Sequence, residues 1–174
     1  MGKLSEEFES YMESQMKGEK QSETKVDHGV YGAKYIFCRY ENGDYIQKIA
    51  SQIIAFVICY HHGGLSDCIG KNEIPLIKRM GKLSEENLHA VTKEFEELFS
   101  TTDLTNIFSK ACEEIQSFIE TISKKNIELD SFFFDIHLLI KTLYSILIDS
   151  DWLDSYLFEA DIPIEEYKSS KPLE

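Results

Sequence analysis

Two neighbouring histidines, His61 and His62, are the residues of this 174-residue chain best suited to metal chemistry. They stand in the segment Tyr60-His61-His62-Gly63-Gly64-Leu65-Ser66-Asp67, where two glycines end a helical pattern. Neutral imidazoles are ligands for divalent transition-metal ions, and the C-terminus of a helix favours a nearby cation. The pair therefore predicts two rings aimed into one metal pocket.

A carboxylate holds a comparable place near the end of the chain. Positions 133, 136, 140, 143 and 147 carry apolar side chains at helical spacing, and Asp151 continues that stripe. A buried carboxylate is unfavourable unless it is paired or binds a metal. We therefore expect Asp151, rather than Asp149, to face a metal pocket. Metal binding is not the only interpretation of these residues. The histidine on the apolar stripe could be a core residue with its hydrogen bonds satisfied, and Asp151 could belong to a solvated helix end. Spacing alone leaves both alternatives open.

Apolar residues at intervals of three and four predict the helices that position these groups. The clearest stripe begins at Ile46 and ends at His61. Other helices are predicted from Ser5 to about residue 17, after Asp27 as its cap, after Ser84, after Asp103 and from about Asp130, whereas residues 68–80 suggest a loop. Trp152 and Tyr156 are expected in the core. Because no alternating strand pattern appears, we predict one all-α domain over residues 1–162 and a polar tail over 163–174.

Composition predicts a folded cytoplasmic protein. Hydrophobic residues make up 43% of the chain, well above the content of disordered chains. The longest apolar run, residues 53–59, is too short to cross a bilayer, and the first residues do not resemble a signal peptide, so no membrane partner is expected. The cysteines Cys38, Cys59, Cys68 and Cys112 are interpreted as core residues, with zinc binding by Cys59 and Cys68 as an alternative.

The net charge of −13 bears on the choice of partners. Proteins that bind DNA over an extended surface neutralise phosphates with Lys and Arg, and an acidic surface repels them. Such binding is therefore disfavoured for this chain alone. The charge suits solubility, attraction of metal ions or docking on a basic partner.

Four motifs in order along the chain resemble the HD nuclease domain of the type I CRISPR effector helicase-nuclease. They are Gly2-Lys3 before a helix containing Phe8, Asp27-His28 at a helix start, His61-His62-Gly63-Gly64-Leu65 with Asp67, and Ser150-Asp151-Trp152-Leu153. The resemblance spans most of the chain and implies a helical HD phosphohydrolase-like bundle that cuts single-stranded DNA with transition metals.

The resemblance implies metal-ligand roles for His28, His61, His62 and Asp151, with manganese, nickel, cobalt or iron as the ion. Lys3 matches a lysine expected near a substrate phosphate. The family signature reads His-Asp-x-Gly-Lys, and Met1 stands at the x, so we expect a bundle lacking the first helices and the His-Asp pair. In a two-metal hydrolase that carboxylate bridges the ions, so one ion or none is expected here.

The first functional hypothesis is therefore a solitary, catalytically defective relative that acts as a decoy or inhibitor in antiviral defence. As such an anti-CRISPR protein, it would bind the type I surveillance complex or the effector nuclease. The alternative is an active, metal-dependent nuclease of a CRISPR system that cuts single-stranded DNA. A helical interaction domain without a CRISPR role is the third interpretation. Core surface left uncovered by the absent first helices would favour a homodimer.

Overall fold

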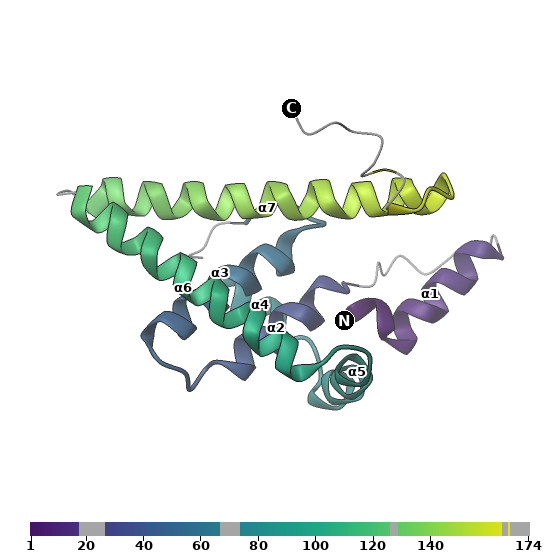
Figure 1. Ribbon diagram of the computed structural model, residues 1–174. Helices are drawn as coiled ribbons and strands as arrows, with labels where there is room; N and C mark the ends of the chain where they lie inside the picture. The colour runs from purple at the N-terminus through teal and green to yellow at the C-terminus, as the bar shows by residue number, and fades with distance from the viewer. Residues whose placement is uncertain (18–26, 67–73, 126–128, 165–166, 168–174) are drawn as a thin grey trace.

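The computed structural model describes residues 1–17, 27–66, 74–125, 129–164 and 167, and their regular secondary structure is entirely helical (Figure 1). The elements in order are η1 (Gly2–Leu4), α1 (Glu6–Met16), α2 (Gly29–Arg39), α3 (Tyr45–Tyr60), α4 (Pro75–Met80), α5 (Glu85–Leu98), α6 (Thr101–Lys125) and α7 (Leu129–Glu159). The predicted all-α class is confirmed for these residues. Residues 18–26, a polar stretch without helical periodicity whose sequence predicts a loop, lie outside them.

Helix α3 forms the centre of the fold. It starts at a capping box, in which the Asp44 carboxylate accepts a hydrogen bond from the backbone N–H of Gln47 and the Gln47 side chain accepts one from Asp44 N. Its buried residues include Ile53 and Val57, and it contacts α2, α6 and α7. The helix ends with His61 as its C-cap, so the predicted position of His61 at the end of the buried stripe is confirmed.

Helix α2 packs along α3 and brings its own start to the end of α3 (Figure 1). The prediction that Asp27 caps this helix is wrong. His28 occupies the N-cap position without a side-chain capping bond. The Asp27 carboxylate instead accepts a hydrogen bond from Arg79 at 2.6 Å, because the folded chain places a guanidinium within its reach.

The loop predicted over residues 68–80 is partly wrong, because residues 75–80 form helix α4. Pro75 occupies the first turn, where its missing N–H costs no hydrogen bond. Leu76 and Met80, one turn apart, are both buried. A helix of six residues is too short to show a periodic stripe, which is why the pattern suggested a loop.

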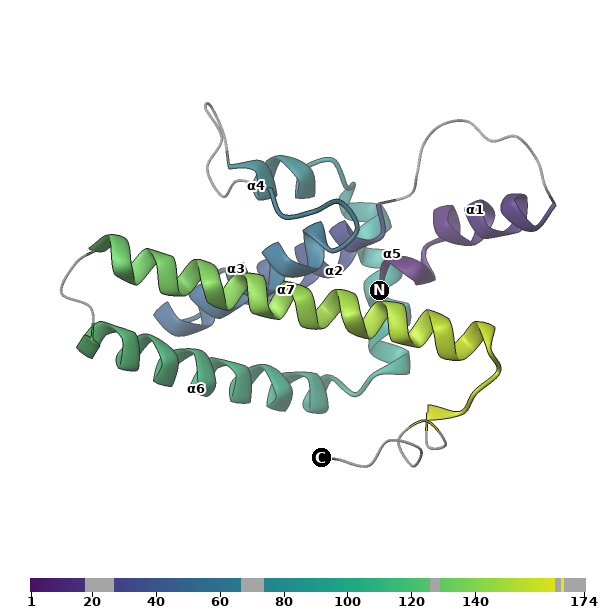
Figure 2. The same cartoon turned by 90° about the horizontal axis from the view of Figure 1, so that it is seen from above.

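Helices α6 and α7 lie alongside each other and run in opposite directions, and α7 also packs on α3 (Figure 2). The face of α7 that contains Ile136, Ile140 and Leu147 joins the hydrophobic core. Trp152 and Tyr156 lie elsewhere on the helix, and their exposed fractions of 75% and 58% show that the prediction of core aromatics is wrong. By length and composition, α7 is the one described helix that could cross a membrane.

The cysteines divide by burial. Cys59 and Cys112 are free cysteines and are buried, as predicted, whereas Cys38 is exposed on α2 and is not a core residue. Burial raises the pKa of the Cys59 thiol to about 11. The proposed zinc partner Cys68 lies outside the described residues.

Candidate metal centre

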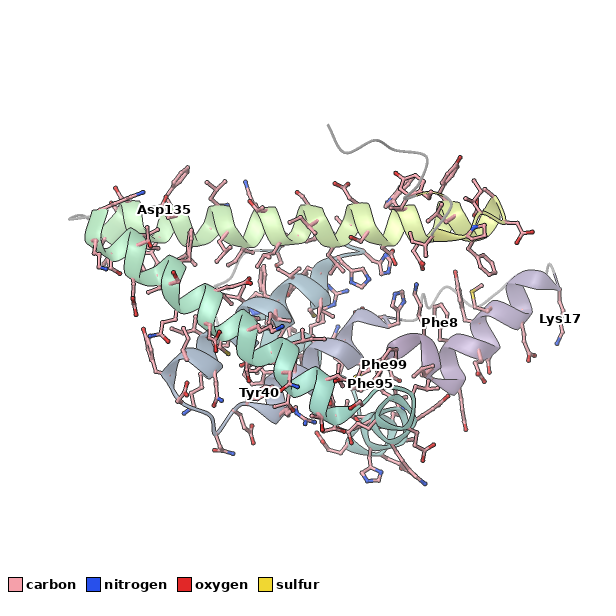
Figure 3. The ribbon with its side chains drawn as sticks, in the orientation of Figure 1. Phe8, Lys17, Tyr40, Phe95, Phe99 and Asp135 are labelled. Atoms are coloured by element: carbon pink, nitrogen blue, oxygen red, sulfur yellow. The ribbon has the colours of Figure 1, made fainter. Side chains whose placement is uncertain are left out.

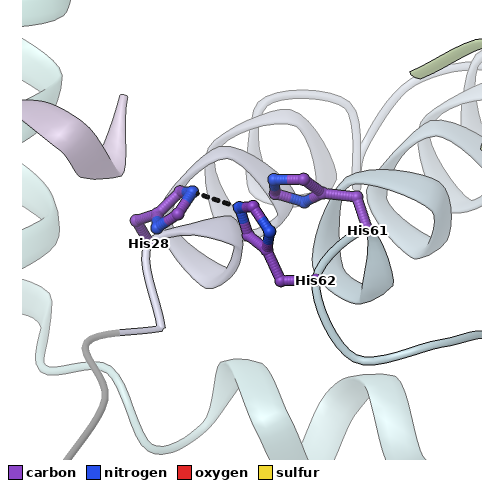
Figure 4. Close-up of side chains that lie close together, drawn as sticks. All are labelled: His28, His61 and His62. Atoms are coloured by element: carbon purple, nitrogen blue, oxygen red, sulfur yellow. Dashed lines mark hydrogen bonds between the residues drawn. The ribbon is translucent and has the colours of Figure 1, made fainter. Parts of the chain in front are cut away.

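Three histidines from two helix ends meet in one cluster, shown in Figure 4. His28 precedes α2, and His61 and His62 follow α3. One ring nitrogen from each lies within 4.8 Å of those of the other two. The cluster therefore combines residues that are 33 positions apart in the chain, and it contains the three histidine ligands that the family resemblance implies.

The His61 ring is fixed by a backbone carbonyl. Its Nδ1 lies 2.6 Å from the carbonyl oxygen of Ile58, and because a carbonyl only accepts hydrogen bonds, Nδ1 must carry the proton. In neutral His61, the lone pair is then on Nε2. This arrangement, in which one ring nitrogen donates to a fixed acceptor and the other is left for an ion, is typical of metal-binding histidines.

His28 is the most perturbed member of the cluster. Burial, together with the charges of His62, His61 and Lys3, lowers its pKa to about 4, and the charge of Asp151 acts in the opposite direction. His28 is therefore neutral at pH 7, as a ligand must be. Its Nδ1 is buried without a hydrogen-bond partner in the described part of the chain.

The donor set fits one transition-metal ion. The Nε2 atoms of His28 and His62 lie 2.7 Å apart, so that one donates a hydrogen bond to the other. Tetrahedral ligand nitrogens about 2.1 Å from a shared ion lie about 3.4 Å apart, so the rings of His28 and His62 would give up this hydrogen bond and separate slightly when an ion binds. The residues that would hold the ion are His28, His61 and His62.

Two glycines allow the close approach of these segments. A Cβ atom on Gly29 would lie 2.7 Å from the carbonyl oxygen of Ile58 and 3.2 Å from the His61 ring. On Gly2, it would lie 2.5 Å from the Cα atom of His28. Sequence reasoning did not assign Gly29 to the site, although a glycine directly after a helix cap suggests close backbone contact.

The other two predicted site residues pair with each other beside the cluster. Asp151 Oδ1 on α7 accepts a hydrogen bond from Lys3 Nζ on η1 at 3.4 Å. Asp151 is not a member of the three-histidine group, although its charge acts on His28. Phe8 of α1, labelled in Figure 3, packs its ring edge-on to His28 with 5.2 Å between ring centroids.

One cationic side chain of α4 contacts both segments that carry the cluster. Arg79 of α4 donates to Asp27, which precedes His28, and its guanidinium lies 4.9 Å from the ring centroid of Tyr60, which precedes His61. One side chain thus ties the two histidine-bearing segments together. Nothing in the sequence pattern pointed to Arg79, because its role depends on the folded position of the short helix α4.

No protein-family model matches the chain, and comparisons with curated proteins and with solved structures gave no significant match.

Proposed function

We propose that this chain is a cytoplasmic metal-binding domain of the HD nuclease type, which contributes to hydrolysis of phosphodiester bonds in single-stranded DNA during type I CRISPR interference. The convergence of His28, His61 and His62 supports this function best. A bound manganese, nickel, cobalt or iron ion would supply Lewis-acid stabilisation of a phosphoryl oxygen.

The chain's own residues would position the ion and the substrate. The Ile58 carbonyl orients His61, and burial keeps His28 neutral. Lys3 stands beside the cluster, where its ammonium group is suited to attract a phosphate. Asp151 holds Lys3 by an ion pair and adds negative charge close to the ion's position.

A decoy role is the second candidate, and the net charge of −13 favours it. An acidic domain binds DNA weakly on its own but can dock on a basic protein surface. The described cluster also has three imidazoles and no carboxylate, whereas a two-metal hydrolase needs a bridging carboxylate. In this role, the protein would occupy the surveillance complex or the effector nuclease without cutting DNA.

A cleavage assay separates the two functions. Purified protein is incubated with labelled single-stranded DNA and with manganese, nickel, cobalt or iron. We expect cleavage that His61→Ala abolishes and that the matched control His89→Ala, an exposed histidine on α5, leaves intact.

Absence of cleavage with every metal would contradict the nuclease function. A pull-down with the type I surveillance complex and the effector nuclease then tests the decoy. Binding to either would support it, and binding to neither would eliminate it.

A further inference from the structure

Helix α7 presents large apolar side chains on the face that points away from the core. Phe134, Leu138, Trp152 and Tyr156 have exposed fractions of 64%, 52%, 75% and 58%. No described helix lies over this face in Figure 1. These side chains form two exposed apolar patches on one helix, and exposed apolar patches are typical of an interaction site.

These residues belong to one straight stripe. Successive members of the stripe are four, three, four, four, three and four residues apart: Phe134, Leu138, Lys141, Ser145, Asp149, Trp152 and Tyr156. Spacing of this kind repeats every eleven residues, which is close to a whole number of helical turns, so the stripe stays on one side of α7. The pattern also reads the same in both directions from Ser145.

This symmetry matches an antiparallel second copy of the same helix. If two α7 helices cross at Ser145, Phe134 of each lies opposite Tyr156 of the other, and Leu138 lies opposite Trp152. The apolar pairs then lie about 10 to 16 Å from the crossing point along the helix axis.

The charges in the stripe fit the same register. Lys141 and Asp149 each lie about 6 Å from Ser145 along the axis, on opposite sides. In the antiparallel pair, each lysine therefore lies opposite an aspartate, and both contacts form at once. The small side chain of Ser145 at the centre allows the two helices to approach closely.

We propose that the exposed face of α7 is the interface of a two-fold symmetric homodimer, in which two α7 helices pair antiparallel about Ser145. Interfaces of this type place the same patch of both subunits in contact, so the patch must be complementary to itself. The stripe satisfies this condition in its apolar pairs, its charged pairs and its spacing.

The size of the interface predicts a weak dimer. Large side chains that are at least half exposed provide roughly 400 to 500 Å² per chain, or about 1,000 Å² in total with their neighbours, which is the lower end for a specific interface. We expect a dissociation constant of about 10 μM. A lipid bilayer is the alternative to a second copy as the partner that covers the exposed face of α7. Lys141 and Asp149 in the middle of the stripe oppose insertion into a bilayer.

The dimer is independent of the metal centre. Asp151 contacts Lys3 on the side of α7 that faces the rest of the fold, whereas Trp152 is one residue further along the helix and exposed. Metal binding should therefore continue in variants that no longer dimerise.

Sedimentation velocity from about 1 to about 100 μM protein tests the proposal. The wild type should change from monomer to dimer across this range. Trp152→Glu should raise the dissociation constant at least about 10-fold, because it places a charge in an apolar contact. The control Phe158→Glu, at an exposed aromatic outside the stripe, should leave it unchanged.

Exchange of the charges tests the register. Lys141→Glu places two carboxylates opposite each other at both contacts and should weaken the dimer about 5-fold or more. The double variant Lys141→Glu/Asp149→Lys should return the dissociation constant to within about 2-fold of the wild type. Circular dichroism confirms that each variant is folded.

Three outcomes would overturn the proposal. They are a monomer at every concentration, a dimer that tolerates Trp152→Glu, and a double variant that stays as weak as Lys141→Glu. Binding of monomeric protein to phosphatidylcholine and phosphatidylglycerol vesicles, lost in Trp152→Glu, would identify a lipid surface as the occupant instead.

Discussion

Single residues at the histidine cluster are held by very close contacts. Gly29 lies against the end of α3 with no room for a side chain, and the Ile58 carbonyl that it faces is the same group that orients His61. The geometry of the cluster therefore depends on a residue that binds nothing itself.

The substitution Gly29→Ala tests this dependence. Its Cβ would push apart α2 and the end of α3, so we expect metal affinity to fall at least about 10-fold and stability to fall by about 1 to 3 kcal/mol. Isothermal titration with Mn²⁺ and urea unfolding measure the two effects. In the control Gly63→Ala, the new Cβ meets only Arg79 at 3.9 Å, so both quantities should stay near the wild type. Equal affinity in the two variants would show that close packing at Gly29 does not position His61.

The lowered pKa of His28 predicts how the metal-free protein responds to acid. Unfolded His28 binds a proton below about pH 6.5, whereas the folded residue binds one only below about pH 4. Between these values the unfolded state holds more protons, so stability falls as the pH falls. The contribution is of the order of 1 kcal/mol after allowance for solvent screening.

Urea unfolding of metal-free protein at pH 7 and pH 5 measures this contribution. The variant His28→Asn lacks the titrating ring, so it should lose less stability than the wild type between these two pH values. An identical loss in both proteins would mean that His28 titrates normally in the folded state.

The sequence predicts only some of the residues at the histidine cluster. The stripe that ends at His61 predicts where that ring lies, because a helical repeat fixes which face a residue occupies. His28 comes from a segment 33 positions away, and only the family resemblance pointed to it. The roles of Gly29 and Arg79 depend on contacts between helices, which no local pattern encodes.

At the scale of elements, periodicity predicts helices well and predicts burial less well. The long helices α3, α5, α6 and α7 match their stripes, because each shows several turns of the repeat. Helix α4 has too few turns. Trp152 and Tyr156 show why burial is harder to predict than helix formation. An apolar residue on a helix can face solvent when no other element covers it.

Two substitutions in α7 distinguish its faces. Ile140 is 9% exposed in the core, so Ile140→Ala should lower the free energy of unfolding by about 2 to 4 kcal/mol. Trp152 is exposed, so Trp152→Ala should change it by no more than about 0.5 kcal/mol. Urea unfolding below about 1 μM, where the proposed dimer is dissociated, gives both values. If only Trp152→Ala lowered the free energy of unfolding strongly, the face that contains Trp152 would be the buried one, contrary to this assignment.

At the scale of the whole molecule, the histidine cluster and the exposed stripe of α7 are separate features of one bundle. The core of α2, α3, α6 and α7 holds the histidine-bearing helix ends together and leaves one side of α7 uncovered. The net charge of −13 opposes broad contact with DNA, so the proposed activity on DNA would depend on the histidine cluster rather than on the surface as a whole.

The most direct test is the number and type of ligands around a bound ion. Equilibrium dialysis with Ni²⁺, followed by X-ray absorption at the nickel edge, should give one ion per chain with three imidazole ligands. His28→Ala, His61→Ala and His62→Ala should each remove binding, and His89→Ala should not. Failure of the wild type to retain an ion, or retention by all three variants, would contradict the proposal that this histidine cluster is a metal site.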